Sequence, residues 1–211
     1  MRYHPNVFHL EDRAIQLMSV EDSDEILSLA AEGKYIDPYW GKVWDSAVPS
    51  SQCLLRSQVD PGIRTLEIGC GCGLLGIAGL IKGLQVTFSD HEPAAVELAC
   101  RNARLNGFEG FGRQVFAWDS HLDWEFDMII ASDVLYDENN FPVLLEMSDS
   151  VLKDGGSFRL GDPGRRSVSR FLSLASDANW KVGIFDRELE PVTLPAINQF
   201  QWIVLSKPVA G

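Results

Sequence analysis

Long hydrophobic runs are absent from this sequence, and basic residues are few for its length. No apolar run among the 211 residues reaches the ~20 residues that a membrane-spanning helix requires. Residues 1–13 also lack the apolar stretch of a secretory signal peptide, so we expect a cytoplasmic protein without a membrane partner. The 18 Lys and Arg are outnumbered by 30 Asp and Glu, which argues against the basic face that nucleic-acid binding needs. The net charge of −12 fits either a basic, lysine-bearing partner or solubility alone.

Cysteine is also scarce, with only Cys53, Cys70, Cys72 and Cys100. Structural zinc sites typically use two closely spaced cysteine pairs, and the single Cys70-x-Cys72 pair has no second pair to match it. We therefore expect no metal site and interpret these two cysteines as small residues in a tight turn. Four cysteines without a disulfide framework favour a reducing compartment.

From residue 63 onward, short apolar runs alternate with segments of helix length. The runs are rich in Val, Ile and Phe and predict strands at 63–68, 85–90, 113–118, 126–132 and 156–162. The intervening segments predict helices at 74–83, 92–107, 139–156 and 165–178. Alternation of this kind implies right-handed crossovers and a parallel sheet.

The end of the chain differs from this pattern. Residues 180–189 and 198–206 both predict strands, and the loop between them is too short for a helical crossover, so the pair should be antiparallel. The predicted fold is therefore α/β: a Rossmann-like, doubly wound, seven-stranded sheet, mostly parallel, with an antiparallel C-terminal hairpin.

The first 60 residues are less regular. They predict a short strand at 13–19, a helix at 19–33 and a second helix from about Ser46. We expect one domain overall, in which residues 1–60 pack on a core formed by residues 61–211.

The segment LEIGCGCGLLGIAG, residues 66–79, places glycines at alternating positions directly after an apolar run. A dinucleotide loop has the spacing G-x-G-x-x-G, whereas here the third glycine comes one residue too early. Glu67 would also repel a diphosphate, by about 4 kcal/mol at ~4 Å and an effective dielectric constant near 20. A ligand with an ammonium group and no phosphate fits better, and S-adenosylmethionine is such a ligand.

Two further acidic residues follow expected strands. Asp90 lies about 20 residues after the first glycine, where a carboxylate accepts ribose hydroxyls in doubly wound folds; the alternative is a helix N-cap. Trp118 and Asp119 end the next expected strand and could flank an adenine; the alternative is a core tryptophan followed by a turn aspartate.

At these residues the chain resembles the class I seven-strand methyltransferases. The resemblance rests on E-x-G-x-G-x-G at 67–73, on Ser-Asp at 89–90 and on SDVLYD at 132–137. Asp133-x-x-Tyr136 resembles the D-x-x-Y signature of the protein-lysine methyltransferase branch, which modifies chaperones, elongation factors and the electron-transfer flavoprotein β-subunit.

Other segments resemble different members of that branch. VWDSA at 43–47 is similar to the chaperone-modifying enzymes, whereas DPYWGKVW at 37–44 and GDPGR at 161–165 are similar to the flavoprotein-subunit enzymes. The mixture leaves the protein target open. The resemblance implies a substrate-facing role for Asp133 and Tyr136. The expected cofactor-binding residues are Trp44, Glu67, Gly69, Cys70, Gly71, Asp90, His91, Trp118, Asp119 and Ser132.

Methyl transfer to a lysine requires the neutral amine. From a reference pKa near 10.4, neutrality at pH 7 costs about 4–5 kcal/mol. A carboxylate at Asp133 stabilises the ammonium form, so we assign it an orienting and recruiting role, with Tyr136 holding the amine. The alternative is that Asp133 caps the next segment and Tyr136 only packs. Arg165 and Arg166 are expected to be solvated or to touch an acidic part of a protein substrate.

The sequence thus predicts an S-adenosylmethionine-dependent methyltransferase acting on a protein lysine. The first alternative is a methyltransferase for a small amine or metabolite on the same fold. The second is a non-catalytic module that keeps the cofactor pocket.

Overall fold

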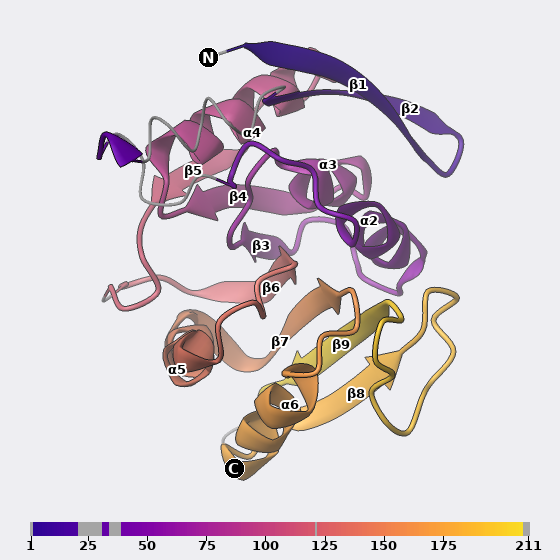
Figure 1. Ribbon diagram of the computed structural model, residues 1–211, viewed down its shortest axis with the longest axis vertical. Helices are drawn as coiled ribbons and strands as arrows, with labels where there is room; N and C mark the ends of the chain where they lie inside the picture. The colour runs from indigo at the N-terminus through magenta and orange to yellow at the C-terminus, as the bar shows by residue number, and fades with distance from the viewer. Residues whose placement is uncertain (1, 21–30, 34–38, 121, 209–211) are drawn as a thin grey trace.

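The computed structural model describes residues 2–20, 31–33, 39–120 and 122–208. These residues form a seven-stranded sheet in the order β5-β4-β3-β6-β7-β9-β8 (Figure 1). The strands are β3 Arg64–Glu67, β4 Gln85–Asp90, β5 Gly112–Val115, β6 Phe126–Ser132, β7 Leu152–Asp162, β8 Lys181–Phe185 and β9 Gln201–Ser206. β3 to β7 are parallel, and β9 runs antiparallel to both β7 and β8. The predicted fold is confirmed.

Helices cover both faces of this sheet. They are α2 Ala47–Arg56, α3 Leu74–Ile81, α4 Pro93–Leu105, α5 Phe141–Val151 and α6 Val168–Asp177, with a short 3-10 helix at Glu138–Asn140. α2, α3 and α4 pack on one face and α5 and α6 on the other, so that two apolar cores form (Figure 1). No helix in the described part of the chain is long and apolar enough to cross a membrane.

Several predicted boundaries were wrong. The strand predicted at 180–189 ends at Phe185, and the strand predicted at 198–206 begins at Gln201. The helix expected to reach residue 156 ends at Val151. β7 begins at the next residue, Leu152, which is buried and pairs with Phe126 of β6. The strand expected at 113–118 ends at Val115, so Trp118 lies in the loop after β5.

The N-terminal residues form a separate antiparallel hairpin of β1, Tyr3–Leu10, and β2, Arg13–Val20. The short strand predicted at 13–19 is confirmed by β2, whereas β1 was not predicted. Asn102 of α4 holds the hairpin, because its side chain accepts from Met18 N–H at 2.8 Å and donates to Met18 O at 2.9 Å.

The helix expected at 19–33 falls largely outside the described residues, the helix expected from Ser46 is confirmed by α2, and the division at residue 60 stays a prediction.

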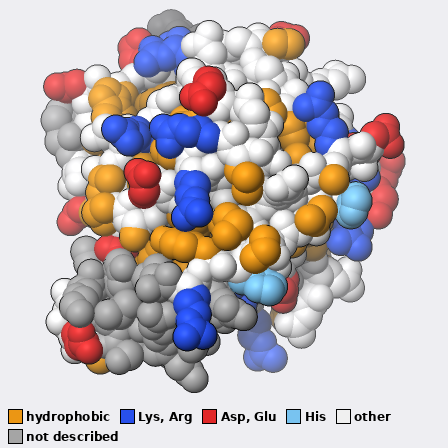
Figure 2. Space-filling view, turned by 90° about the horizontal axis from the view of Figure 1, so that it is seen from above, with side chains coloured by type: hydrophobic (Ala, Val, Ile, Leu, Met, Phe, Trp, Pro, Cys, Tyr) orange, Lys and Arg blue, Asp and Glu red, His pale blue; other side chains and the backbone are white. Residues whose placement is uncertain are grey.

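Seen from above, where β1 and β2 lie, charged side chains of both signs are interspersed with hydrophobic ones (Figure 2). Such mixing is typical of a solvated face.

Candidate active site

The glycine loop connects β3 to α3 and requires glycine for two separate reasons. Gly69, Gly71 and Gly73 have φ values of 59°, 48° and 81°, in the left-handed region that side chains disfavour. A Cβ at Gly73 would lie 2.7 Å from Ala99 Cβ, and a Cβ at Gly71 would lie 3.0 Å from Trp40 O. The loop is therefore a tight turn pressed between α4 and the segment before α2.

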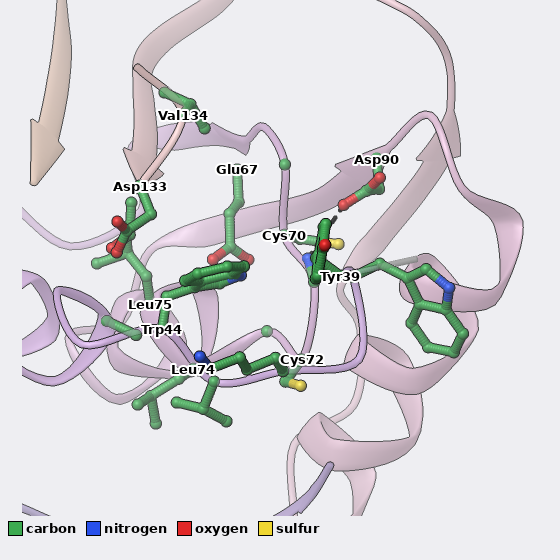
Figure 3. Close-up of a pocket in the computed structure, with 18 of the residues that line it drawn as sticks. Tyr39, Trp44, Glu67, Cys70, Cys72, Leu74, Leu75, Asp90, Asp133 and Val134 are labelled. Atoms are coloured by element: carbon green, nitrogen blue, oxygen red, sulfur yellow. Dashed lines mark hydrogen bonds between the residues drawn. The ribbon is translucent and has the colours of Figure 1, made fainter. Parts of the chain in front are cut away.

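A cavity of about 340 Å³ opens at this loop. It lies beyond the carboxyl ends of β3, β4 and β6, the edge where open α/β sheets bind ligands. Figure 3 shows Glu67, Asp90 and Asp133 around it, with Trp44 and Tyr39 nearby. All predicted site residues except Asp119 line the cavity. The lining residues that were predicted are Trp44, Glu67, Gly69, Cys70, Gly71, Asp90, His91, Trp118, Ser132, Asp133 and Tyr136. Asp119 is exposed in the loop after β5.

Glu67 is the most deeply placed acid of the cavity, with 3% of its surface exposed. Its Oε1 accepts from Gly76 N–H at 2.9 Å, whereas its buried Oε2 has no hydrogen-bond partner among the described residues. Burial, assisted by the charge of Asp90, raises the pKa of Glu67 to about 8. Glu67 therefore lines the cavity with a carboxyl that has one oxygen without a hydrogen-bond partner among the described residues, and a cationic group of a ligand would complement it.

Asp90 is fixed by backbone amides. Its Oδ2 accepts from Gly71 N–H at 3.1 Å, and its Oδ1 accepts from Glu92 N–H at 3.0 Å. His91 Nδ1 lies 3.3 Å from the same Oδ1. Asp90 therefore accepts from the glycine loop and from the residue that precedes α4 while its side chain lines the cavity. It is not the N-cap of α4, which is Glu92.

Asp133 follows β6 with a φ of 63°, a backbone conformation that few residues other than glycine adopt. Its Oδ2 accepts from Ser46 N–H at 3.2 Å, and its Oδ1 accepts from the Arg165 guanidinium at 2.7 Å. Burial raises the pKa of Asp133, and Arg165 opposes that effect. Both oxygens of this carboxylate are thus engaged within the protein.

Arg165, expected to be solvated or to touch an acidic part of a substrate, pairs instead with two acids of this chain, which the sequence analysis did not predict. Its guanidinium bonds Asp133 and also Asp162 Oδ2, the latter at 2.8 Å, and it lines the cavity. The turn in the segment GDPGR positions it: Gly164 has a φ of 92°, and Asn198 N–H donates to Gly164 O at 2.8 Å. That turn brings Arg165 back toward the sheet edge. Arg166, the next residue, is exposed.

Aromatic side chains form the outer part of the cavity. Tyr136 is 57% exposed and Trp44 is 38% exposed, although both line it. Tyr39 packs edge-on against Trp44 with ring centroids 6.0 Å apart, and Lys42 Nζ lies 4.5 Å from the centroid of the Trp44 ring. The cavity therefore runs from buried acids to an exposed aromatic mouth.

The described residues contain no group of three or more His, Cys, Asp or Glu side chains arranged to hold a metal ion. The four cysteines are buried and not disulfide-bonded. Burial raises the pKa of Cys72 to about 12, so this thiol stays protonated at neutral pH. Cys70 and Cys72 act here as small buried residues of the turn.

Comparison with known proteins finds a family whose model matches most of the chain. The model of a family described as lysine methyltransferase matches residues 23–175. The protein N-lysine methyltransferase METTL21A of Danio rerio is 36% identical over 113 residues, covering 49% of this chain and 51% of that protein. The electron transfer flavoprotein beta subunit lysine methyltransferase of Xenopus laevis is 31% identical over 138 residues, covering 64% and 56%. The chain spans about half the length of these curated relatives.

A solved structure shares the fold. The N-methyltransferase NodS from Bradyrhizobium japonicum, in complex with S-adenosyl-L-homocysteine, superposes with a TM-score of 0.63 at 19% identity. The match covers 87% of this chain and 98% of that one.

Proposed function

The chain belongs to the lysine methyltransferase family, and from that premise we propose that it transfers a methyl group from S-adenosylmethionine to a lysine side chain of a protein. The observation that carries this proposal is the cavity that joins buried Glu67 and Asp90 to Asp133 and Tyr136 at its open end. The names of both curated relatives, which act on lysine, support the same acceptor.

The residues present fit S-adenosylmethionine. Its amino acid portion carries an ammonium group, and the carboxyl of Glu67, which lines the cavity, is the complementary acceptor. Asp90 lies at the end of β4, where a carboxylate meets ribose hydroxyls in doubly wound folds. Trp118 offers an aromatic surface for the base. When bound, this cofactor supplies a methyl group on a positively charged sulfur, already activated for transfer.

The chain's own residues then have to position and desolvate the acceptor amine. Tyr136 and Trp44 surround the mouth, where aromatic faces attract a lysine side chain and exclude water. Asp133, at the inner side of that mouth, orients the amine through its carboxylate. Because the mouth is exposed rather than closed, a long side chain on a protein surface can reach it, which favours a protein over a small metabolite.

The proposal includes a protein partner with an accessible lysine and a cytoplasmic location. The net charge of −12 favours a basic partner segment, since opposite charges steer association. The buried free cysteines are typical of a reducing compartment.

The test uses the purified full chain, a cell lysate and S-adenosylmethionine labelled in its methyl group. Protein and small-molecule fractions are separated, and labelled protein is hydrolysed to identify the methylated amino acid. We expect methyl-lysine in a protein band, lost with Asp133→Asn and kept with Asp154→Asn, a matched change at an exposed residue near the start of β7. Label confined to small molecules, or to another amino acid, would overturn the proposed acceptor.

A further inference from the structure

Arg165 joins two acids that come from the ends of neighbouring strands. One guanidinium nitrogen lies 2.7 Å from Asp133 Oδ1 and the other lies 2.8 Å from Asp162 Oδ2. Asp133 follows β6 and Asp162 ends β7, so the arginine spans the edge of the sheet at the cavity. The three side chains together carry one net negative charge.

The turn after β7 is held by backbone hydrogen bonds as well as by the ion pair. Asp162 is fully buried and already accepts from the backbone N–H groups of Gly164 and Arg165, both at 2.7 Å. The Arg165 side chain is 25% exposed and lines the cavity, so its charge faces the space that the acceptor would enter. The arginine therefore acts on the cavity as well as on the turn.

The positive charge of Arg165 helps to explain how the acceptor lysine can lose its proton beside a carboxylate. A carboxylate beside the acceptor holds lysine as an ammonium ion, which has no free electron pair to attack a methyl group. A guanidinium bonded to that carboxylate offsets its attraction for the ammonium, while the neutral amine is little affected. Asp133 can then orient the amine without holding its proton.

Building on the proposed methyl transfer, we propose that Arg165 is a positioning residue that neutralises Asp133 so that the acceptor lysine can lose its proton in the site. Other charged or titratable groups line the same cavity: Tyr39 and Lys42 before α2, Glu67 at the end of β3, Cys70 and Cys72 in the glycine loop, Asp90 at the end of β4, His91 after β4, and Tyr136 after β6. They are the same in each variant below, so differences between variants report on the arginine and its two acids.

The test measures how the rate depends on pH. Initial rates of methyl-lysine formation are recorded from pH 6.5 to 10 with saturating S-adenosylmethionine and with lysate protein, at several concentrations, as acceptor. The wild type is compared with Arg165→Gln, with Asp162→Asn and with Arg166→Gln. The last variant removes the same charge from the adjacent, exposed arginine and is the matched control.

Removing Arg165 leaves an unneutralised carboxylate, so the midpoint of the rise in rate should move up by about 1 pH unit. The rate at pH 7.5 then falls about tenfold and recovers to within about twofold of wild type at pH 9.5. Asp162→Asn keeps the arginine and the Oδ1 acceptor but removes one negative charge, so its midpoint should move down. Arg166→Gln should match the wild type.

Three outcomes would overturn the inference. Arg165→Gln could lower the rate by one factor at every pH, as a merely structural role would. It could leave the profile unchanged. If Arg165→Gln does not fold, Asp162→Asn decides between a structural role and the proposed positioning role of Arg165. A pH midpoint of the rate that stays the same or rises in Asp162→Asn refutes the positioning role. A wild type that makes no methyl-lysine at any pH instead refutes the proposed function.

Discussion

Glu67→Gln is the most informative single substitution for stability. The side chain is 3% exposed, and burial raises the pKa of Glu67 from its ordinary value of 4.5 to about 8. The folded protein therefore holds an extra proton between those two pH values. The stability that depends on this proton is fully present below pH 4.5 and is lost as the pH rises through 8.

The size of the effect follows from the width of that window. At about 1.4 kcal/mol for each pH unit, the whole window corresponds to roughly 5 kcal/mol. An experiment from pH 5.5 to 8 crosses most of it, so the wild type should lose about 3 kcal/mol through this group alone. Glutamine has nearly the same shape and never ionises, so Glu67→Gln should lose none of this amount.

The assay is urea unfolding of both proteins, without ligand, at several pH values in this range. Every other titratable group is shared, so the difference between the two unfolding free energies isolates Glu67. We expect the stability of the variant relative to the wild type to increase by about 3 kcal/mol between pH 5.5 and pH 8. Parallel curves over the whole range would show that Glu67 does not hold a proton and would refute the reasoning.

Three further substitutions test the parts that build the site. A Cβ at Gly76 would overlap both the Glu67 carboxyl and the Phe88 ring, so Gly76→Ala should lower the free energy of unfolding by about 2 kcal/mol or more in a urea titration. Asn102 is fully buried and its amide ties the hairpin to the glycine loop, so Asn102→Ala should cost about 2–3 kcal/mol in the same titration; a loss under about 0.5 kcal/mol would contradict this. Trp118→Ala should weaken binding of S-adenosylhomocysteine about tenfold in calorimetry, whereas unchanged affinity would remove Trp118 from the base site.

The order of elements was predictable because the core strands are continuous apolar runs with clear ends. β4 and β6 match the expected residues 85–90 and 126–132. β1 was missed because most of its side chains are partly or fully exposed, so it lacks the apolar alternation of a core strand. It is held by its pairing with β2, across a two-residue turn, rather than by an apolar face of its own.

Much of the site was predictable for a geometrical reason. Parallel strands end at one edge of the sheet, so acids at the ends of β3 and β4 and directly after β6 are expected to lie close together. Asp119 does not line the cavity because β5 ends earlier than its apolar residues suggested. The bond between Arg165 and Asp133 spans 32 positions and depends on the turn at Gly164, which no local pattern reveals.

The central claim is that this cavity holds the cofactor through two acids, and a crystal structure with S-adenosylhomocysteine tests it most directly. The account predicts the ligand's amino group beside Glu67 and its ribose hydroxyls beside Asp90, with its sulfur facing the side of the cavity that carries Asp133. Ligand bound elsewhere on the protein, or lying in the cavity without contact to either acid, would contradict it.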